Sequence, residues 1–379
     1  MSSTPKTMFE FEAIPQMDLA AQYTAIGAEV RDAVTKVMAS QRFVLGSEGA
    51  ALESEIAELC GVKHGVAVAS GTDALILALR AAGVEAGDEV ILPPFTFVAT
   101  GSAVSALGAR PVFADIQPDT FNIDVDEIAT HITPRTRAIL VVHLYGLAAD
   151  MDAIRETARH HGIPIVEDNA QAIGATYKGQ PTGALGDVAC ISFYPTKNLG
   201  AYGDAGMIVT NSAEMDTRLR TLRNHGQSSR YTSLEPGWNS RLDEIQAAIL
   251  RVKLRYLRDW ERARRSHAAT YAKLLAPVKA IRTPRIPAGY GHVFHQYTIR
   301  APRRDELHKF LNERKIGNAV YYPVPLHLQP IYAKLGHGRG AFPEAERAAD
   351  EVLSLPMFPE LREEQVERVA EAIAAFYRG

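Results

Sequence analysis

The chain has 379 residues, a length that accommodates one large domain and a smaller one. Apolar residues make up 46% and charged residues 22%, which is typical of a globular protein with a substantial core. The formal net charge is −3 and no basic run occurs, so nothing indicates nucleic-acid binding. Only Cys60 and Cys190 are present, without a CxxC motif, and we therefore expect a reducing, cytoplasmic location.

One stretch, 90–109, runs without a charge and raises the question of a membrane span. It contains the pair Pro93-Pro94 and several hydroxyl side chains, among them Thr96 and Thr100. This polarity favours a buried strand, a turn and a core helix over a span. The N-terminal segment 1–18 lacks the apolar core of a signal peptide. We therefore expect no membrane segment.

From about residue 65, short apolar runs alternate with amphipathic segments. Such alternation of strand and helix predicts a mainly parallel sheet covered on both faces. In sheets of this kind ligands bind beyond the carboxyl ends of the strands, so functional residues are expected there. The predicted strands are 65–69, 89–92, 111–114, 138–142, 163–166 and 188–192, with helices at 73–82 and 150–161.

After about residue 210 the pattern changes. It predicts a helix at 213–224, a Gly/Ser/Pro-rich loop at 226–240 and a long charged helix at 241–275. We therefore predict a large domain over residues 1–250 and a smaller C-terminal α/β domain over 251–379. The smaller domain is expected to contain a strand at 296–300, helices at 305–313 and 363–376, and a proline-rich turn at 322–325.

The first predicted strand ends in Ser70-Gly71-Thr72, directly before a helix. Small residues here let the backbone approach an anion, and the free N–H groups of a helix start favour a phosphate. Gly71 and Thr72 are thus candidate phosphate ligands, although such a turn is also a common structural connection. Phe97 follows the next strand, where it could stack on a flat ring or lie in the core.

Two further strand ends carry charged residues. Asp168 is a candidate to hold a protonated pyridine nitrogen, with Gln171 three residues later, because a carboxylate after an apolar strand needs water or a cation. The alternative is that Glu167 and Asp168 are two solvated carboxylates at the mouth of a loop. Lys197 follows another strand end beside the hydroxyl of Ser192, a setting that suits a Schiff-base lysine near a phosphate ligand.

Six motifs occur in order: SGTDAL, TFVAT, EDNAQA, SFYPTKNLGAYGDAG, RNHG and NSRLDEIQAA. In these motifs the chain resembles the DegT/StrS family of nucleotide-sugar aminotransferases over roughly residues 15–378. The resemblance implies the fold of the aspartate aminotransferase class (fold type I), with pyridoxal 5′-phosphate (PLP) on Lys197. It also implies that Asp168 meets the pyridine nitrogen, that Gln171 lies near the ring hydroxyl and that Phe97 stacks on the ring.

The resemblance further implies a phosphate site made by Gly71, Thr72 and Ser192. Asn239 matches a phosphate ligand that the second subunit supplies in this family. A homodimer with shared active sites is therefore expected.

The resemblance also suggests a substrate, a nucleotide-linked keto sugar, and a donor, L-glutamate. The segments 225–231 and 239–243 resemble those of members that aminate carbon 3 of the sugar. Arginine binds phosphate in bidentate fashion, so Arg241 could meet the nucleotide diphosphate. Four residues match positions near the sugar, with inter-domain packing or a surface turn as the alternative: Tyr194, Tyr321, Tyr322 and His327.

Three alternatives remain at the level of sequence. The enzyme could aminate carbon 4, it could be a PLP-dependent sugar dehydratase, or the chain could be a non-catalytic regulatory protein. Lys197 argues against the dehydratase branch, in which a histidine replaces this lysine. His292 and His295 lack a third ligand at a recognisable spacing, so no metal is expected.

Overall fold

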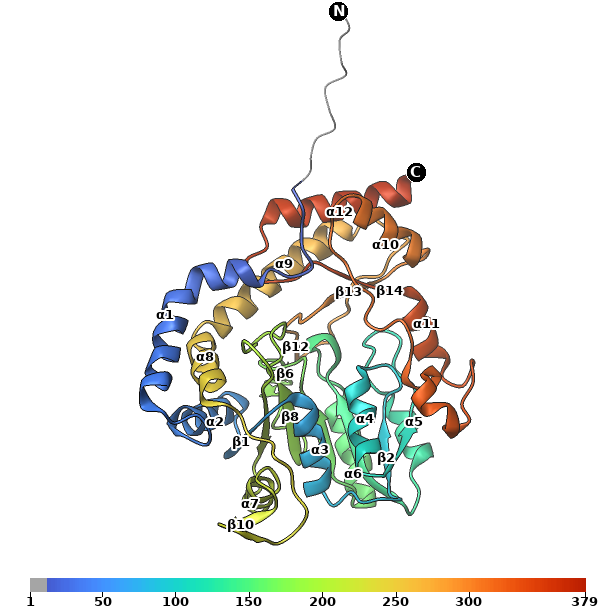
Figure 1. Cartoon of the computed structure of the whole chain (residues 1–379). Coiled ribbons are helices and arrows are strands. Elements are labelled where there is room, and N and C mark those ends of the chain that lie inside the picture. Colours follow the sequence, from blue (N-terminus) through green and yellow to red (C-terminus); the bar gives the residue numbers. More distant parts are fainter. Residues whose placement is uncertain (1–11) are drawn as a thin grey trace, which may run out of the picture.

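The computed structural model describes residues 12–379 and centres on a seven-stranded sheet (Figure 1). The strands lie in the order β1-β9-β8-β5-β4-β2-β3, and the neighbours from β8 to β3 run parallel. β9 runs antiparallel to both of its neighbours and was not predicted. The mainly parallel α/β class is confirmed. The strands are β1 (His64–Val68), β2 (Glu89–Leu92), β3 (Arg110–Phe113), β4 (Thr136–Val142), β5 (Ile165–Asp168), β8 (Val188–Ser192) and β9 (Gly206–Thr210).

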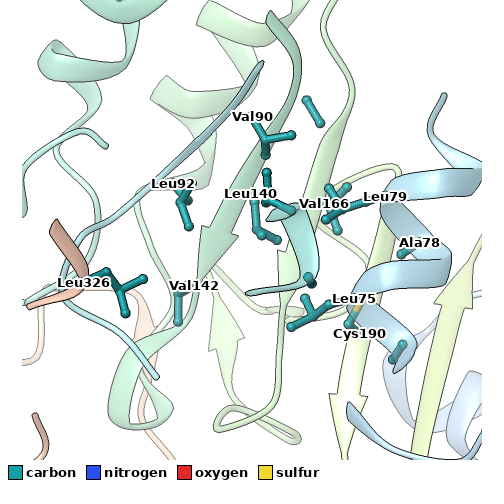
Figure 2. Packing of buried hydrophobic residues seen from close by; sticks show 14 of the residues in the cluster. Leu75, Ala78, Leu79, Val90, Leu92, Leu140, Val142, Val166, Cys190 and Leu326 are labelled. Carbon is teal, nitrogen blue, oxygen red and sulfur yellow. The ribbon is translucent and has the colours of Figure 1, made fainter. Parts of the chain in front are cut away.

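Helices cover both faces of this sheet, which is why its central strands carry runs of apolar side chains that point to both sides. In β4, Leu140 and Val142 pack on one face and Ile139 and Val141 on the other, as the two-residue repeat of a strand requires. Figure 2 shows the first face, with Leu75 of the helix that follows β1. On that face lie α3 (Gly71–Ala81), α4 (Val98–Ala106), α7 (Ala213–Leu222) and α11 (Pro343–Glu351); on the other lie α2 (Ser47–Cys60), α5 (Val125–His131), α6 (Met151–His161) and α8 (Glu244–Leu254).

The uncharged stretch 90–109 contains the end of β2, a turn and the buried helix α4, as predicted. No helix within residues 12–379 is both long and apolar enough to cross a membrane. Short elements complete the connections: η1 (Leu144–Gly146), β6 (Thr176–Tyr177), β7 (Gln180–Pro181), β10 (Gln227–Ser229), β11 (Thr232–Ser233), β12 (Tyr290–Gly291), η2 (Leu326–Leu328) and η3 (Pro330–Leu335).

A second apolar core surrounds an antiparallel pair of strands near the C-terminus. Tyr271 and Tyr297 stack at its centre with ring centroids 4.9 Å apart. Ile14 belongs to the same core, where it forms a parallel bridge with Ile316. Figure 1 shows this core above the large sheet. Its elements are β13 (Tyr297–Arg300), β14 (Val352–Leu355), α9 (Leu257–Leu275), α10 (Arg304–Glu313) and α12 (Glu363–Arg378).

The long helix predicted at 241–275 is two helices in the structure, α8 and α9, separated near Tyr256. α8 packs against α2 and against α1 (Leu19–Ser40), a helix that was not predicted, whereas α9 packs against α12. The two halves therefore serve different cores, and the chain changes direction between them.

Part of the C-terminal third packs with the large sheet. Leu326 and Phe342 are buried in the core beneath α3 and α4, and Figure 2 shows Leu326 on the side of Leu92. The Asp115 carboxylate, just after β3, accepts hydrogen bonds from the N–H groups of Glu344 and Ala345, both at 2.9 Å, and so caps α11. The division at residue 250 stays a prediction, and the large core includes residues well beyond it.

Glu261 lies on α9 where this helix meets the loop after β5. Its Oε1 is buried and has no hydrogen-bond partner among residues 12–379, and a Cβ on Gly174 would lie 1.7 Å from it. Gly174 also has a φ of +82°, so only glycine suits this position. Burial raises the pKa of Glu261 to about 7, although Arg265 and Arg264 oppose the shift.

Glu261→Gln is therefore expected to stabilise the protein at pH 8 but not at pH 4.5. The pKa of Glu261 is higher in the folded protein than in the unfolded chain. Protonation of Glu261 therefore stabilises the folded protein fully below the unfolded pKa, and this stabilisation is lost as pH rises through about 7. The expected gain at pH 8 is about 2–3 kcal/mol. Urea unfolding at pH 4.5 and pH 8 measures it, with Glu367→Gln on the exposed side of α12 as control. A gain of equal size at both pH values would contradict this prediction.

Candidate active site

The predicted site residues gather at the edge of the sheet where the parallel strands end. Asp168 is the last residue of β5, and Ser192 is the last residue of the neighbouring strand β8. Lys197 lies in the turn after Ser192, and its N–H donates to the carbonyl of Tyr194 at 2.8 Å. The structure thus brings together the charged strand ends that the sequence singled out.

A small-residue cradle lies between β8 and the start of α3. A Cβ on Gly71 would lie only 2.6 Å from Cβ of Ser192, so the absence of a side chain lets the two segments meet. Ser70 caps the helix by accepting from the N–H of Asp73 at 3.1 Å. As the first residues of a helix, Gly71 and Thr72 have N–H groups with no partner inside the helix. These donors and the Ser192 hydroxyl suit a phosphate.

Asp168 is buried, and its side chain has two hydrogen-bond donors. The hydroxyl of Thr100 donates to Oδ2 at 2.9 Å and the N–H of Ala170 to Oδ1 at 3.2 Å. Burial raises the pKa of Asp168, which these hydrogen bonds and the charge of Lys197 oppose. A carboxylate in this position is stabilised by a cationic group placed next to it.

Burial lowers the pKa of Lys197 to about 8, and the nearby Asp168 opposes the shift. An ordinary lysine is almost wholly protonated at neutral pH, whereas this one has an appreciable neutral fraction. A neutral amine attacks a carbonyl carbon and accepts a proton, and both abilities are required of a Schiff-base lysine.

Gln171 joins the strand ends to the segment that precedes α11. Its Oε1 accepts from the N–H of Tyr145 at 2.7 Å, and its Nε2 donates to the hydroxyl of Tyr322 at 3.0 Å. The ring of Phe97 is half exposed and lies 6.1 Å from that of Tyr322, centroid to centroid. Phe97 is therefore not a core residue, and its face is available to a flat ligand.

The residues expected near the sugar separate into two groups. Tyr321 lies with Tyr322, and its carbonyl accepts from the hydroxyl of Tyr145; Tyr194 is half exposed next to the Lys197 turn. His327 is buried, with its Nε2 3.1 Å from Oε1 of Glu346. The tyrosines border the site, whereas His327 is neither at its surface nor in a surface turn.

Asn239 and Arg241 form a separate group. Arg241 donates to Oδ1 of Asn224 at 3.0 Å, and Asn239 pairs with the same residue through the backbone. Asn239 is exposed. Among residues 12–379, no hydrogen bond or ion pair joins this group to Lys197 or Asp168.

Sequence reasoning missed several residues that shape the site. Thr100 and Tyr145 contact the predicted residues directly, and Glu167 and His143 form a pair beneath them. The His143 Nδ1 accepts from the N–H of Ala149 at 3.1 Å, so the proton on Nε2 is donated to Glu167 at 2.8 Å. His143 follows β4 directly, so its place at a strand end was the signal that could have found it.

The site fits a flat, phosphate-bearing cofactor with a cationic ring and an aldehyde. The donors at Gly71 and Ser192 suit the phosphate, the buried carboxylate of Asp168 suits the cation, and the amine of Lys197 suits the aldehyde. Among residues 12–379, no group of three or more His, Cys, Asp or Glu side chains is placed to hold a metal ion.

Comparison with known proteins defines the class of the molecule. A model of the DegT/DnrJ/EryC1/StrS aminotransferase family matches residues 24–374. The chain belongs to this aminotransferase family, and the resemblance found in the six motifs is confirmed.

Two curated relatives match almost the whole chain. A Geobacillus stearothermophilus protein named pleiotropic regulatory protein is 53% identical over 367 residues, which cover 96% of this chain and 99% of the relative. The UDP-N-acetyl-3-dehydro-alpha-D-glucosamine 3-aminotransferase of Acidithiobacillus ferrooxidans is 48% identical over 372 residues, which cover 98% and 100%.

Solved structures agree with this assignment. The structure of S. venezuelae DesV in complex with a ketimine intermediate is 46% identical and has a TM-score of 0.95, covering 97% of this chain and 100% of that one. NtdA from Bacillus subtilis with bound cofactor PMP is 31% identical with a TM-score of 0.91, covering 98% and 87%. The predicted aspartate-aminotransferase-like fold is thereby confirmed.

Proposed function

We propose that the protein is a PLP-dependent aminotransferase that moves the amino group of L-glutamate to carbon 3 of a nucleotide-linked keto sugar. The observation that carries the proposal is the placement of Lys197, whose pKa lies near 8, and of the buried carboxylate of Asp168 beyond adjacent strand ends, close enough for their charges to interact. The 48% identity to an enzyme named for amination at carbon 3 of a UDP-sugar supports the substrate class. Cys60 and Cys190 are buried and unpaired, which supports a cytoplasmic location.

PLP, when bound, supplies an electron sink for the carbon that loses its proton. Asp168 would hold the proton of the ring nitrogen, because a buried anion favours a neighbouring cation. Lys197 would bind the aldehyde and, once released as a neutral amine, carry a proton between donor carbon and cofactor. Gln171 would meet the ring hydroxyl, and Phe97 would cover one face of the ring.

Gly71, Thr72 and Ser192 would hold the cofactor phosphate. Gly71→Ala is expected to weaken PLP binding by about 5- to 150-fold, because the new methyl forces Ser192 aside at a cost of about 1–3 kcal/mol. Titration of the cofactor-free protein with PLP measures this effect. Gly338→Ala is the control, since a Cβ there meets nothing within 4 Å. Equal affinities of Gly71→Ala and wild type would contradict the phosphate assignment.

The sugar nucleotide would lie on the open side of the site. Tyr194, Tyr321 and Tyr322 border that side and would contact the sugar. Arg241 would bind the diphosphate in bidentate fashion. His327, buried against Glu346, would support this region from behind and not touch the sugar.

A homodimer would complete each site, with Asn239 reaching the cofactor phosphate of the partner subunit. Two features support this. Asn239 is exposed, and within residues 12–379 no hydrogen bond joins it to Lys197 or Asp168. Apolar side chains are also exposed on the loop between α1 and α2, among them Phe43, Val44 and Leu45. Apolar surface of this kind commonly marks a subunit interface.

Mixing two inactive variants tests the shared site. Lys197→Ala and Asn239→Ala are each expected to lack activity, whereas mixed dimers contain one site with both residues intact. After unfolding and joint refolding, activity is expected to return to about a quarter of the wild-type level if dimers form at random. No recovery in a mixture that does dimerise would contradict the assignment of Asn239.

The absorption spectrum of the purified protein, before and after L-glutamate, tests the function. A visible band that bleaches with L-glutamate and returns with a UDP- or dTDP-linked 3-keto sugar is the expected result. Return of the band only with a 4-keto sugar would move amination to carbon 4, and keto product without nitrogen transfer would indicate a dehydratase.

The 53% identity to a protein named as a regulator favours a second candidate, a non-catalytic regulator. A protein that binds PLP but ignores every amino donor and sugar nucleotide would favour that candidate.

A further inference from the structure

A buried segment, 292–296, passes behind the Lys197 turn. The N–H of Val293 donates to the carbonyl of Gly146 at 3.1 Å, and the guanidinium of Arg264 donates to the carbonyl of Phe294 at 3.1 Å. Phe294 has a φ of 46°, a left-handed conformation that a bulky residue keeps only when its surroundings hold it there. The segment is therefore fixed in position and can serve as a support.

Asn198, the residue after Lys197, is buried and touches this segment with both ends of its amide. Its Nδ2 donates to the carbonyl of Val293 at 3.1 Å. Its Oδ1 lies 3.2 Å from Nδ1 of His295. Since the carbonyl of Val293 can only accept, the amide nitrogen must face it and the amide oxygen must face the imidazole. The proton of the second hydrogen bond therefore belongs to His295 Nδ1.

His295 keeps this proton on one nitrogen only. Burial holds the pKa of His295 well below its usual value, and the positive charges of Lys197 and Arg264 lower it further. Among residues 12–379, these two cations are the charged groups that act on the imidazole. The imidazole therefore stays neutral across the physiological range, and its Nδ1–H donor is constant.

We infer that His295 is a positioning residue, which fixes the catalytic lysine by holding Asn198 through its Nδ1–H group. Hydrogen bonds then hold the Lys197 turn on both sides, from the N–H of Lys197 to Tyr194 and from the side-chain amide of Asn198 to the segment 292–296. Together they keep the amine of Lys197 at a fixed position relative to Asp168. Loss of one of these hydrogen bonds allows the turn to move, and a small displacement of the Lys197 amine slows the reaction.

Two variants of nearly equal size and shape separate the hydrogen bond from the packing. His295→Asn keeps an N–H donor near the position of Nδ1, whereas His295→Leu removes it. In His295→Leu we expect kcat to fall about 10- to 100-fold, the effect of leaving one buried partner unsatisfied, with KM changed by less than about 3-fold. His295→Asn is expected to remain within about 3-fold of the wild-type kcat.

A second measurement does not depend on turnover. The cofactor-free protein is mixed with PLP, and the rate at which the visible band of lysine-bound cofactor appears is followed. This rate is expected to fall in His295→Leu in parallel with kcat and to be restored in His295→Asn. His292→Leu is the matched control, because His292 is equally buried in the same segment but contacts Phe294 and not Asn198. It is expected to lower the melting temperature without slowing the appearance of the band.

Three results would overturn the inference. They are equal rates in His295→Leu and wild type, equal losses in His295→Asn and His295→Leu, or a loss in His292→Leu as large as that in His295→Leu. Should His295→Leu not fold, His295→Gln, which moves the donor by one carbon, replaces it in the comparison. The inference rests on the proposed role of Lys197. If the wild type forms no band with PLP, the proposed function falls together with it, whereas a normal wild-type band with any of the three results removes the inference alone.

Discussion

Lys197→Ala is expected to lower turnover by at least about 10⁴-fold while the protein stays folded. The amine has two roles in the proposed function, the covalent link to the cofactor and the transfer of a proton, and proton transfer by a positioned group alone contributes about 10²- to 10⁴-fold. Lys197 is half-buried in a turn that is closed by a hydrogen bond from the backbone N–H of Lys197 to the carbonyl of Tyr194. An alanine keeps this backbone hydrogen bond and with it the local structure.

Single-turnover absorbance with L-glutamate checks this prediction, and circular dichroism checks the fold. Lys63→Ala, at an exposed position before β1, is the control. Wild-type Lys197 should also capture PLP with a midpoint near pH 8, because the amine reacts only after losing its proton. Residual turnover within tenfold of wild type would contradict the role of Lys197, and a midpoint near that of an ordinary lysine would contradict the effect of burial.

Glu167→Ala is expected to cost about 3–5 kcal/mol of folding free energy, a large share of the total for an ordinary protein. The Glu167 carboxylate is fully buried and accepts from His143 and from the N–H groups of Gly183, Leu185 and Gly186, at 2.6–2.8 Å. Burial by itself raises the pKa of Glu167, yet these hydrogen bonds overcome it and hold the pKa below its usual value. Alanine leaves all four donors buried without an acceptor.

Thermal unfolding measures this loss, which is expected to lower Tm by about 4–6 °C for a chain of this length. Glu156→Ala, on the exposed side of α6, should change the unfolding free energy by less than about 0.5 kcal/mol. Glu167→Gln keeps one acceptor oxygen and is expected to recover part of the loss. A Glu167→Ala protein as stable as wild type would show that the four donors find other partners.

The residues that could be predicted from the sequence are those whose role is local. Asp168 and Ser192 are the last residues of their strands and Lys197 lies in the turn after one of them, and the parallel sheet then brings these strand ends to one edge without further information. Phe97 and Gly71 follow the same rule. Strands buried on both faces contain short apolar runs, so their positions could be predicted as well.

The features that escaped prediction depend on contacts between distant segments. The burial of His327 is one such feature. A proline-rich turn usually lies at the surface, and the pairing with Glu346 that buries His327 joins two separate segments. The break between α8 and α9 arises because the two helices pack in different cores. The helical repeat of apolar residues over 241–275 does not indicate where one core ends and the other begins. Glu261 fits beside Gly174 only because α9 crosses the loop after β5.

The cap that Asp115 provides for α11 has a consequence for synthesis of the chain. The large core is closed by Leu326, Phe342 and the residues of α11, which leave the ribosome more than 200 positions after Asp115. Most of the sheet is therefore made before the helix that covers its β3 edge exists. A nascent or truncated chain that ends before residue 343 would present an uncovered apolar surface to chaperones and proteases. The core around the large sheet can therefore be completed only after residues 343–351 have been synthesised.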